Sequence, residues 1–394
     1  MGTTLHLDQA PAEGASSAPS VDPIHSPLVR YVLKGLRNCW LPEQLRWSHI
    51  YHLDGRDKPN ESVPESDVFY SLNVLLGMSQ VADAGSLGYD LAAIFDTCCR
   101  DLVKLNVRKY AYGMALWTSA AMGRELPDEV SDAIYAFARD RSHWRALRAQ
   151  DVGMILTGLT ARAAVGDNRG RDLLEPLFEH LRSKHACSSG LFFEGGGPLR
   201  RRFATFATQT YLTIACYTYF EFSRDERALA LANMCVRRLI ALQGPQGEWP
   251  WFYYVPRGQV ADFYEVYSVH QDGMAPAFLE LAERHGVANA TDAVRNGFNW
   301  ILGENQLGQD MLRLELGMIV RSHLRRGEKD SKLPRMLRSG LTALTGRSRD
   351  LVDPRKLALR LECRSYHLGW ILWSFAQRRD MPEITHAPIF TSTV

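Results

Sequence analysis

The sequence has no long hydrophobic run and almost no net charge. No stretch approaches the roughly 18 consecutive apolar residues of a membrane span. Its 46 basic and 44 acidic residues leave a formal net charge of +2, so no global field favours nucleic acid, and we expect no nucleic-acid partner. Residues 1–27 lack the basic start and the apolar stretch of a secretory signal, and their Ala, Ser and Pro content predicts a disordered tail.

Motifs for metals, disulfides and nucleotides are missing as well. The seven cysteines are odd in number and scattered, without a Cys-x-x-Cys pair, which argues against a disulfide framework and a zinc site. A phosphate-binding loop of the Gly-x-x-x-x-Gly-Lys type is absent. We therefore expect a cytoplasmic protein in a reducing compartment, with no metal and no cofactor.

Helical periodicity dominates what is present. Apolar residues make up 46% of the chain, which is enough to bury a large core. Their helical spacing, interrupted by turns rich in Gly, Pro, Asn or Asp, predicts helices over 67–81, 91–105, 110–122, 128–138, 144–164, 173–181, 203–222, 226–242, 268–285, 290–302 and 366–377. Only two short pieces, near 251–255 and 191–194, suggest strands. The sequence thus predicts a single all-α domain over 28–394.

The dipeptide Gly-Met recurs along these segments, at intervals of one or several helical hairpins. It begins at Gly77, Gly113, Gly153, Gly273 and Gly317. Glycine inside a helix costs about 1 kcal/mol relative to alanine, so its repeated placement suggests that helices approach closely on an inner ring. We therefore predict an (α/α)6-type toroid of helical hairpins with a pocket at the ring centre. Chance recurrence of the dipeptide is the alternative.

Residues 321–360 form a basic segment. It holds twelve Lys and Arg residues against four acids, and apolar residues recur in it at helical spacing: Leu333, Met336, Leu337, Leu341 and Leu344. This pattern is typical of an amphipathic basic helix that contacts anionic lipid or a phosphate-bearing ligand, which would place the protein at the membrane periphery. A solvated insertion between two core helices is the alternative.

The densest group of aromatic and acidic residues lies in 243–273. Pro250 and Pro256, with the glycines beside them, prevent a continuous helix, so we expect a long loop that leads into a helix near Tyr267 or Ser268. Aromatic rings stack on the apolar faces of pyranoses, while carboxylates and amides bind the hydroxyls, so this composition suits a sugar-binding cleft. A plug of ordinary core aromatics at the end of the ring is the alternative.

Acid/base chemistry on a sugar ring needs a proton donor and a proton acceptor. The catalytic candidates in this loop are Glu248, Asp262, Glu265, Tyr267, His270 and Asp272. A hydrogen-bonded structural role for His270 is an equal alternative. The substrate-binding candidates of the loop are Trp249, Trp251, Tyr254, Arg257, Tyr264 and Gln271. Among them, Arg257 would hold a substrate carboxylate through a bidentate guanidinium contact.

Other clusters are candidates for the walls of the same pocket. His49 and Asp67 belong to a polar, aromatic stretch over 47–67, although Asp67 suits the stabilisation of a helix start better. Tyr366 and His367 open the last predicted helix. An inner helix face is suggested by His143, Trp144, Arg148 and Asp151. The Gly-rich stretch 192–197, followed by Arg200, Arg201 and Arg202, predicts a loop with a basic end.

Two short motifs in the aromatic loop resemble known families. Gln243-x-x-x-Gly247-x-Trp249 resembles the QW motif of squalene–hopene cyclases and related prenyltransferase-type toroids, in which the Gln and Trp tie adjacent helices together at a turn. The acidic DxDD motif of those cyclases is absent from this chain. This resemblance implies a toroid.

A second pair of segments is similar to the C-terminal α/α barrel of D-glucuronyl C5-epimerases. The pair is 247–250, Gly-Glu-Trp-Pro, and 267–273, Tyr-Ser-Val-His-Gln-Asp-Gly, which carries one additional Asp before its Gly. A tyrosine of the second segment belongs to the catalytic pair in that family, so the resemblance implies this role for Tyr267. Toroids of this size also resemble N-acylglucosamine 2-epimerases, lyases and six-hairpin glycosidases.

Three functional hypotheses follow. The first is a carbohydrate-active enzyme, an epimerase, lyase or hydrolase, that acts on a poly- or oligosaccharide in the central cleft. The second is a prenyl or terpene cyclase, in which the aromatic faces stabilise carbocations. The third is a non-catalytic scaffold that binds a glycan or another partner. An open polar groove would favour the first, a closed dry aromatic cavity the second, and a filled ring centre the third.

Overall fold

The computed structural model describes residues 25–195, 197–327, 333–345 and 353–391. Of the expected tail, residues 1–24 lie outside the described residues. Helix α1 (Pro27–Cys39) begins at the last residue of that expected tail, with Ser26 as its N-cap. No helix in the described ranges is both long and apolar enough to cross a membrane.

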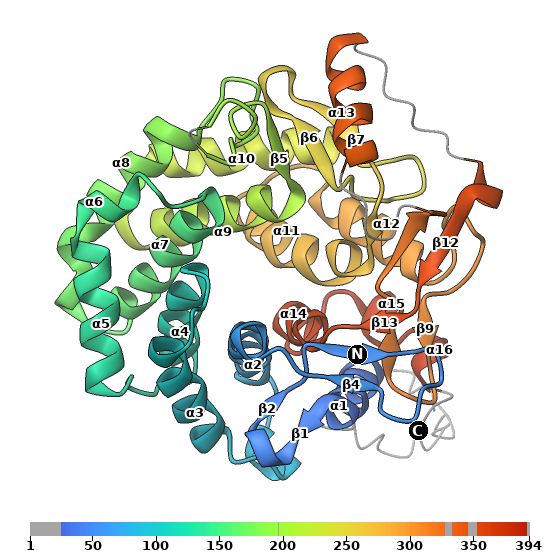
Figure 1. The fold of residues 1–394 in the computed structure, drawn as a ribbon, viewed down its shortest axis with the longest axis horizontal. Helices are drawn as coiled ribbons and strands as arrows, with labels where there is room; N and C mark the ends of the chain where they lie inside the picture. The colour runs from blue at the N-terminus through green and yellow to red at the C-terminus, as the bar shows by residue number, and fades with distance from the viewer. Residues whose placement is uncertain (1–24, 196, 328–332, 346–352, 392–394) are drawn as a thin grey trace, which may run out of the picture.

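Six helices of the described chain form the inner wall of a closed ring (Figure 1). They are α2 (Pro64–Met78), α4 (Tyr110–Ala121), α7 (Ala149–Ala164), α9 (Phe206–Ser223), α11 (Ala275–Arg284) and α14 (Ser365–Phe375). Each inner helix contacts the next, and α14 closes the ring against α2. Helices enclosed by other helices are apolar on nearly all sides. Accordingly, α4 is buried without interruption from Ala111 to Ser119.

An outer layer of amphipathic helices surrounds this ring. It consists of α3 (Leu91–Lys104), α5 (Asp128–Arg139), α8 (Leu174–His185), α10 (Glu226–Leu242) and α12 (Ala290–Ile301), with α1 packed against α14. Each outer helix buries one stripe, as α10 does with Ala228, Ala232, Cys235, Val236 and Leu239. The predicted all-α toroid of the (α/α)6 type is therefore confirmed.

The remaining helical segments lie between and after these helices. They are α6 (Arg141–Trp144), α13 (Leu333–Thr345), α15 (Pro382–Thr385), α16 (Pro388–Thr391), the 3-10 turns η1 (Pro42–Gln44), η2 (Ala84–Leu87), η3 (Asn168–Leu173), η4 (Val255–Arg257) and η6 (Pro354–Lys356), and the π turn η5 (His270–Met274).

Glycine allows the inner helices to approach each other closely. A Cβ atom on Gly113 of α4 would lie 2.1 Å from the carbonyl of Met154 on α7, and one on Gly158 of α7 would lie 2.3 Å from the carbonyl oxygen of Gly113. Gly77 of α2 approaches α14 in the same way. Gly317 differs, because it lies in a turn with φ +67°. Close approach on an inner ring is thus observed at the Gly-Met sites that lie within helices.

Short strands are more numerous than the sequence predicts. They are β1 (Trp40–Leu41), β2 (Arg46–Trp47), β3 (Ile50–His52), β4 (Asn60–Glu61), β5 (Phe203–Thr205), β6 (Phe252–Tyr254), β7 (Gln259–Asp262), β8 (Val266–Tyr267), β9 (Leu312–Arg313), β10 (Met318–Ile319), β11 (Ser322–Arg325), β12 (Leu357–Arg360) and β13 (Glu362–Cys363). The expected piece at 251–255 contains β6, whereas 191–194 contributes only a bridge from Phe192 to Ala186. Strand β11 pairs with β12 and β8, and β13 pairs with β3, so segments far apart in sequence meet beside the ring.

The basic segment 321–360 is partly internal. Its predicted helix is present as α13, with Leu337 and Leu341 exposed, while the side chains of Leu333, Met336 and Leu344 lie outside the described residues. The two ends of the segment form the β11–β12 hairpin, in which Ser322 and His323 are completely buried. A wholly solvated insertion is therefore wrong for these ends.

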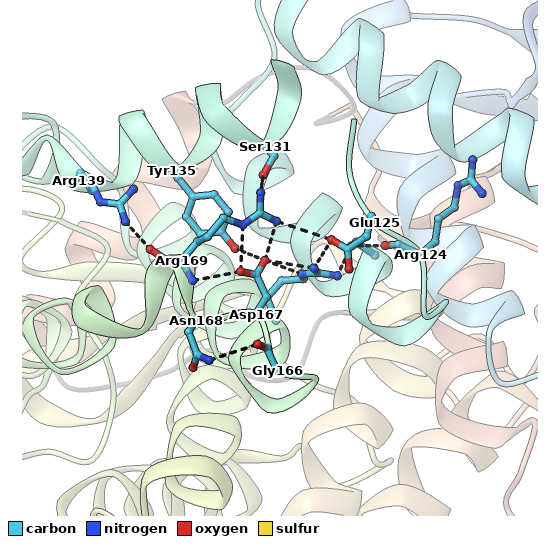
Figure 2. Close-up of polar contacts among 11 residues, drawn as sticks. Arg124, Glu125, Ser131, Tyr135, Arg139, Gly166, Asp167, Asn168 and Arg169 are labelled. Atoms are coloured by element: carbon cyan, nitrogen blue, oxygen red, sulfur yellow. Dashed lines mark hydrogen bonds and ion pairs between the residues drawn. The ribbon is translucent and has the colours of Figure 1, made fainter. Parts of the chain in front are cut away.

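A charged network joins the ends of α4 and α7 to the turns that follow them (Figure 2). The guanidinium of Arg162 is 3% exposed and pairs with the carboxylates of Glu125 and Asp167. Arg169 donates to Asp167 at 2.8 Å, and Tyr135 donates to it at 2.9 Å. These donors hold the pKa of Asp167 well below its usual range, so its charge is satisfied within the protein.

Candidate active site

The inner helices begin at one end of the ring, which we call the mouth. Two adjoining cavities open there, of about 570 Å³ and 470 Å³, and Arg148 lines both. The larger is walled by aromatic rings, with charged groups between them: Phe203, Trp251, Phe252, Tyr267, Arg148, Glu194 and Arg200. A third cavity of about 780 Å³ lies where the inner helices end, and Trp117 and Trp373 contribute to its lining. The ring is therefore hollowed at both ends.

Arg321, directly before β11, is a cation beside Tyr267, a residue that lines the larger mouth cavity. Its guanidinium carbon lies 5.2 Å from the ring centroid of Tyr267, and its Nε lies 3.2 Å from Glu362 of β13. The side chain keeps 19% of its surface exposed, while NH1 is buried without a hydrogen-bond partner in the described chain. Burial opposes the charge of Arg321, but Tyr366, Tyr267, Tyr70 and Glu362 outweigh it and raise its pKa. Arg321 is thus a fixed cation with donor capacity left.

Tyrosines from four inner helices surround the same space. Tyr70 of α2 and Tyr366 of α14 have ring centroids 4.4 Å apart, and Tyr110 and Tyr211 reach the group from α4 and α9. Burial raises the pKa of each of these phenols. They therefore present neutral hydroxyl groups to the ring centre at physiological pH.

Two histidines of the mouth are held neutral. His49 stacks on Tyr70 at 4.5 Å between centroids, and His270 packs on Phe206 at 4.4 Å. Burial lowers the pKa of His49 to about 3, with contributions from the charges of Arg364 and Arg321. Burial likewise lowers the pKa of His270 to about 3, with contributions from Arg321 and His367. The positive charge of Arg321 thus suppresses protonation on both sides.

Glu265 fixes the hydroxyl of Tyr267. Its carboxylate is 1% exposed and pairs with the Nε of Arg360 at 2.9 Å. The Ser322 hydroxyl donates to the same carboxylate, and the Tyr267 hydroxyl donates to it at 3.2 Å. Because these partners come from β11, β12 and β8, the hairpin of the basic segment holds the tyrosine in place.

Asp272 and His367 form a buried pair beneath the mouth. The imidazole Nε2 lies 2.6 Å from Oδ1 of Asp272, a residue without exposed surface, and Oδ2 has no hydrogen-bond partner in the described chain. Burial raises the pKa of Asp272, while His367 opposes this shift. Both predicted residues meet as a pair, but below the accessible surface.

Several predicted substrate contacts lie in the core instead of the cleft. Trp249 is completely buried against Phe206 and Phe278, and its backbone N–H donates to the Gln271 side chain at 3.0 Å. Gln243 donates to the carbonyls of Gly247 and Ala293, so it ties α10 to α12. Trp249 and Gln271 therefore hold the loop together, and Gln243 ties helices together as the QW resemblance implies.

Other candidates are bound to neighbouring segments. Asp262 pairs with Arg325 through two contacts of 2.8 and 3.0 Å, and Arg325 also covers the ring of Tyr264 at 4.9 Å. Arg257 donates to the carbonyl of Ala343 on α13 and lies 5.9 Å from the ring of Tyr254, so it is not placed as a carboxylate clamp in the mouth.

Glu248 and Asp67 bond to nearby backbone. Glu248 is 5% exposed and accepts from the N–H of Gln246 at 2.9 Å, in the turn before β6. Asp67 has no exposed surface and accepts from the N–H of Val63 at 3.1 Å, at the start of α2. The alternative of a helix-start acid, which the sequence favours for Asp67, agrees with this placement.

The structure adds residues that the sequence did not single out for the mouth. In the sequence, Arg321 is one charge of the basic segment, and Tyr70, Tyr110 and Tyr211 lie within predicted helices. Glu194 lines the larger mouth cavity, where burial raises its pKa and Thr208 donates to its carboxylate. A signal existed for Tyr70 and Tyr110, since each lies near the predicted start of an inner helix.

Comparison with solved structures shows the same fold in carbohydrate-active enzymes. A glycosyl hydrolase family 88 protein from Bacteroides vulgatus is 9% identical, with a TM-score of 0.54 over 88% of this chain and 96% of that chain. A sugar epimerase from a ruminal bacterium is 10% identical, with a TM-score of 0.51 over 70% and 85%. A protein described as UGL with the saccharide dGlcA-Glc-Rha-Glc is 13% identical, with a TM-score of 0.55 over 91% and 96%. No protein-family model and no curated protein sequence matches the chain.

These likenesses establish the (α/α)6 toroid fold and a distant structural similarity to a carbohydrate-active hydrolase and an epimerase. The mouth cavities are open and lined by charged groups as well as rings. The larger cavity is mainly aromatic and apolar, with Arg148, Glu194 and Arg200 between its rings.

Proposed function

We propose that this protein is a carbohydrate-active enzyme that binds the carboxylate of an acidic saccharide at Arg321 and exchanges the proton on the adjacent ring carbon. Epimerisation and β-elimination both begin with this step. The observation that carries the proposal is the placement of one largely buried guanidinium among neutral phenols and neutral imidazoles beside the mouth.

Neutralisation of the carboxylate is the first requirement of such chemistry. A proton next to an ionised carboxylate is weakly acidic, because its removal places negative charge beside negative charge. A guanidinium stabilises that developing charge in a site of low dielectric. Arg321 is suited to this role because its guanidinium remains charged and Glu362 occupies only one side of it.

Substrate binding would also activate the histidines. The charge of Arg321 contributes to the low pKa of both His49 and His270. A carboxylate bound to Arg321 would cancel this contribution and raise the basicity of both rings in the complex. In the free protein the imidazoles are weak bases, so the base would be assembled only when an acidic substrate is present.

Tyr267 and His270 are the proposed acid/base pair. Their ring centroids are 5.2 Å apart, and Tyr267 lines the larger mouth cavity. Glu265 orients the phenol, and Trp251 and Phe203 offer flat faces for pyranose stacking. The resemblance of 267–273 to a segment of D-glucuronyl C5-epimerases supports the same tyrosine, and the saccharide in the description of one structural neighbour supports an acidic sugar ligand.

The proposal is tested by proton exchange in D2O. A glucuronate-containing oligosaccharide is incubated with the protein, and the signal of the proton next to the carboxylate is followed by NMR. Tyr267→Phe is expected to lower the exchange rate by about 10²–10⁴-fold, the usual contribution of a general acid or base. Tyr219→Phe, at a buried ring that packs on Phe178, is the matched control and should exchange normally. Equal exchange by wild type and Tyr267→Phe would reject the assignment.

Hydrolysis is a second candidate, favoured by Glu194. A general acid for glycoside cleavage needs a raised pKa, and burial raises that of Glu194 beside the aromatic wall. Asp151 also has a pKa raised by burial, but both of its oxygens accept from backbone N–H groups, of Tyr110 and Arg148. Loss of glycosidic cleavage in Glu194→Gln, with proton exchange absent from the wild type, would establish hydrolysis instead.

A terpene cyclase receives less support from the mouth. Carbocations need a closed, dry aromatic cavity, whereas the larger mouth cavity is open and holds Arg148, Glu194 and Arg200 among its rings.

A further inference from the structure

A separate small pocket lies on the outer side of the ring, between α6 and the end of α8. Its volume is about 310 Å³, and it is lined by Trp144, Arg145, Leu147, His180, Lys184, His185 and Arg201. The lining comes from three places in the chain: the α6–α7 connection, α8, and the loop before β5. No carboxylate belongs to this lining.

The three cations of this pocket lack ion-pair partners within the described ranges. Arg145, Lys184 and Arg201 are exposed, and none forms a salt bridge with a described acid. Nearby arginines on the same outer surface behave differently, since Arg182 pairs with Glu179 at 2.8 Å and Arg227 pairs with Glu179 at 2.6 Å. The pocket therefore gathers positive charge that the protein does not balance.

Helix electrostatics explains only one of these cations. Lys184 lies in the last turn of α8, where a positive charge complements the helix dipole. Arg145 and Arg201 belong to other segments and gain nothing from that helix end. The positive charge of the pocket also affects His180, because burial and the charge of Lys184 lower its pKa. Three elements thus bring like charges together, and a bound anion would offset them.

We infer that this pocket binds a tetrahedral oxyanion, the phosphate or sulfate group of a ligand. A divalent tetrahedral group can accept from donors on three sides, whereas a carboxylate presents one edge and a single charge. Guanidinium groups match phosphate geometry through paired donors, and Lys supplies a point charge. Trp144 contributes its ring to the lining of the pocket. Its indole N–H is already bonded to the carbonyl of Ala138, so it is not a free donor for the anion.

The oxyanion pocket is adjacent to the mouth along two stretches of chain. Arg148 and Arg200 line the larger mouth cavity, while Arg145 and Arg201, close to them in sequence, line this pocket. The assignment of the pocket goes beyond the proposed reaction and does not depend on it.

Calorimetric titration tests the assignment. The full chain is titrated with inorganic phosphate and, separately, with inorganic sulfate, at constant ionic strength in chloride. The doubly substituted variant Arg145→Gln/Lys184→Gln is expected to bind either anion at least tenfold more weakly than wild type. The matched control, Lys58→Gln/Lys104→Gln, removes two exposed positive charges outside the pocket and should stay within twofold of wild type.

Each outcome decides the matter. Binding of both anions to wild type, with the loss confined to the pocket variant, supports the site, and tighter binding of one anion identifies the preferred group. No heat beyond that of chloride, retention of binding by the pocket variant, or an equal loss in the control would overturn it. Arg321→Gln should leave phosphate binding unchanged, so failure of the mouth chemistry and failure of this pocket are distinguishable.

Discussion

Alanine at position 113 tests the close packing that defines the ring. The added methyl group would lie 2.1 Å from the carbonyl carbon and oxygen of Met154 and 2.5 Å from the amide nitrogen of Ile155. All three are backbone atoms inside α7, so no side-chain rotation relieves the clash. Overpacking of a core typically costs about 1–3 kcal/mol, and we expect Gly113→Ala to reach the upper end of that range because two helices must separate.

The assay is urea unfolding followed by circular dichroism. Gly340→Ala is the control, because Gly340 lies within α13 with nothing within 4 Å of the added methyl group. That variant should be unchanged or more stable by up to about 1 kcal/mol, the usual helix gain of alanine over glycine. An unfolding midpoint for Gly113→Ala equal to that of wild type would refute the interpretation that glycine sets the distance between α4 and α7.

Three further predictions concern stability, pH and the mouth. Arg162→Met should lower the free energy of unfolding by about 1–3 kcal/mol in urea titration, because Asp167 loses one charged hydrogen-bond donor while Arg169 and Tyr135 remain; an unchanged unfolding midpoint would contradict this. Burial lowers the pKa of His323 to about 3. Below pH 6.5 the unfolded chain therefore binds a proton that the folded chain does not bind. The free energy of unfolding then falls as the pH drops toward 3. His323→Leu should remove about 1.4 kcal/mol per pH unit from that slope between pH 6 and 4, and an unchanged slope would exclude this origin. Trp251→Ala should weaken oligosaccharide binding about tenfold in calorimetry by removing a stacking face, whereas undiminished affinity would place the sugar elsewhere.

The helical part of the fold was predictable because each hairpin carries its own apolar period. The expected helix 226–242 is α10, and 290–302 ends one residue beyond α12. The expected helix 144–164 is interrupted, because Arg148 adopts an extended backbone before α7 and leaves α6 as a short turn. Helix α1 was not predicted.

The short strands were not predictable from local pattern. A strand of two to four residues is too short to show alternation, and its partners lie far away in sequence. Strand β13 pairs with β3 across more than 300 residues, and β11 bridges β8 and β12. These pairings are what bring Arg321, Arg360 and Tyr267 to the same mouth.

The candidate site was predictable only where its residues lie close together in the sequence. Tyr267, His270 and Asp272 were found from one local motif, and the structure places Tyr267 and His270 beside each other in the mouth, with Asp272 beneath it. In the sequence, Arg321 only opens a long basic segment, for which an amphipathic helix or a solvated insertion is the expectation. Only the pairing of β11 with β8 shows that the first cation of this segment lies over the ring of Tyr267.

A crystal structure with a glucuronate-containing oligosaccharide tests the central claim most directly. The account predicts a sugar carboxylate within about 3 Å of the Arg321 guanidinium, with the pyranose ring between Trp251 and Tyr267. A saccharide bound instead in the cavity at the opposite end of the ring, lined by Trp117 and Trp373, would contradict it.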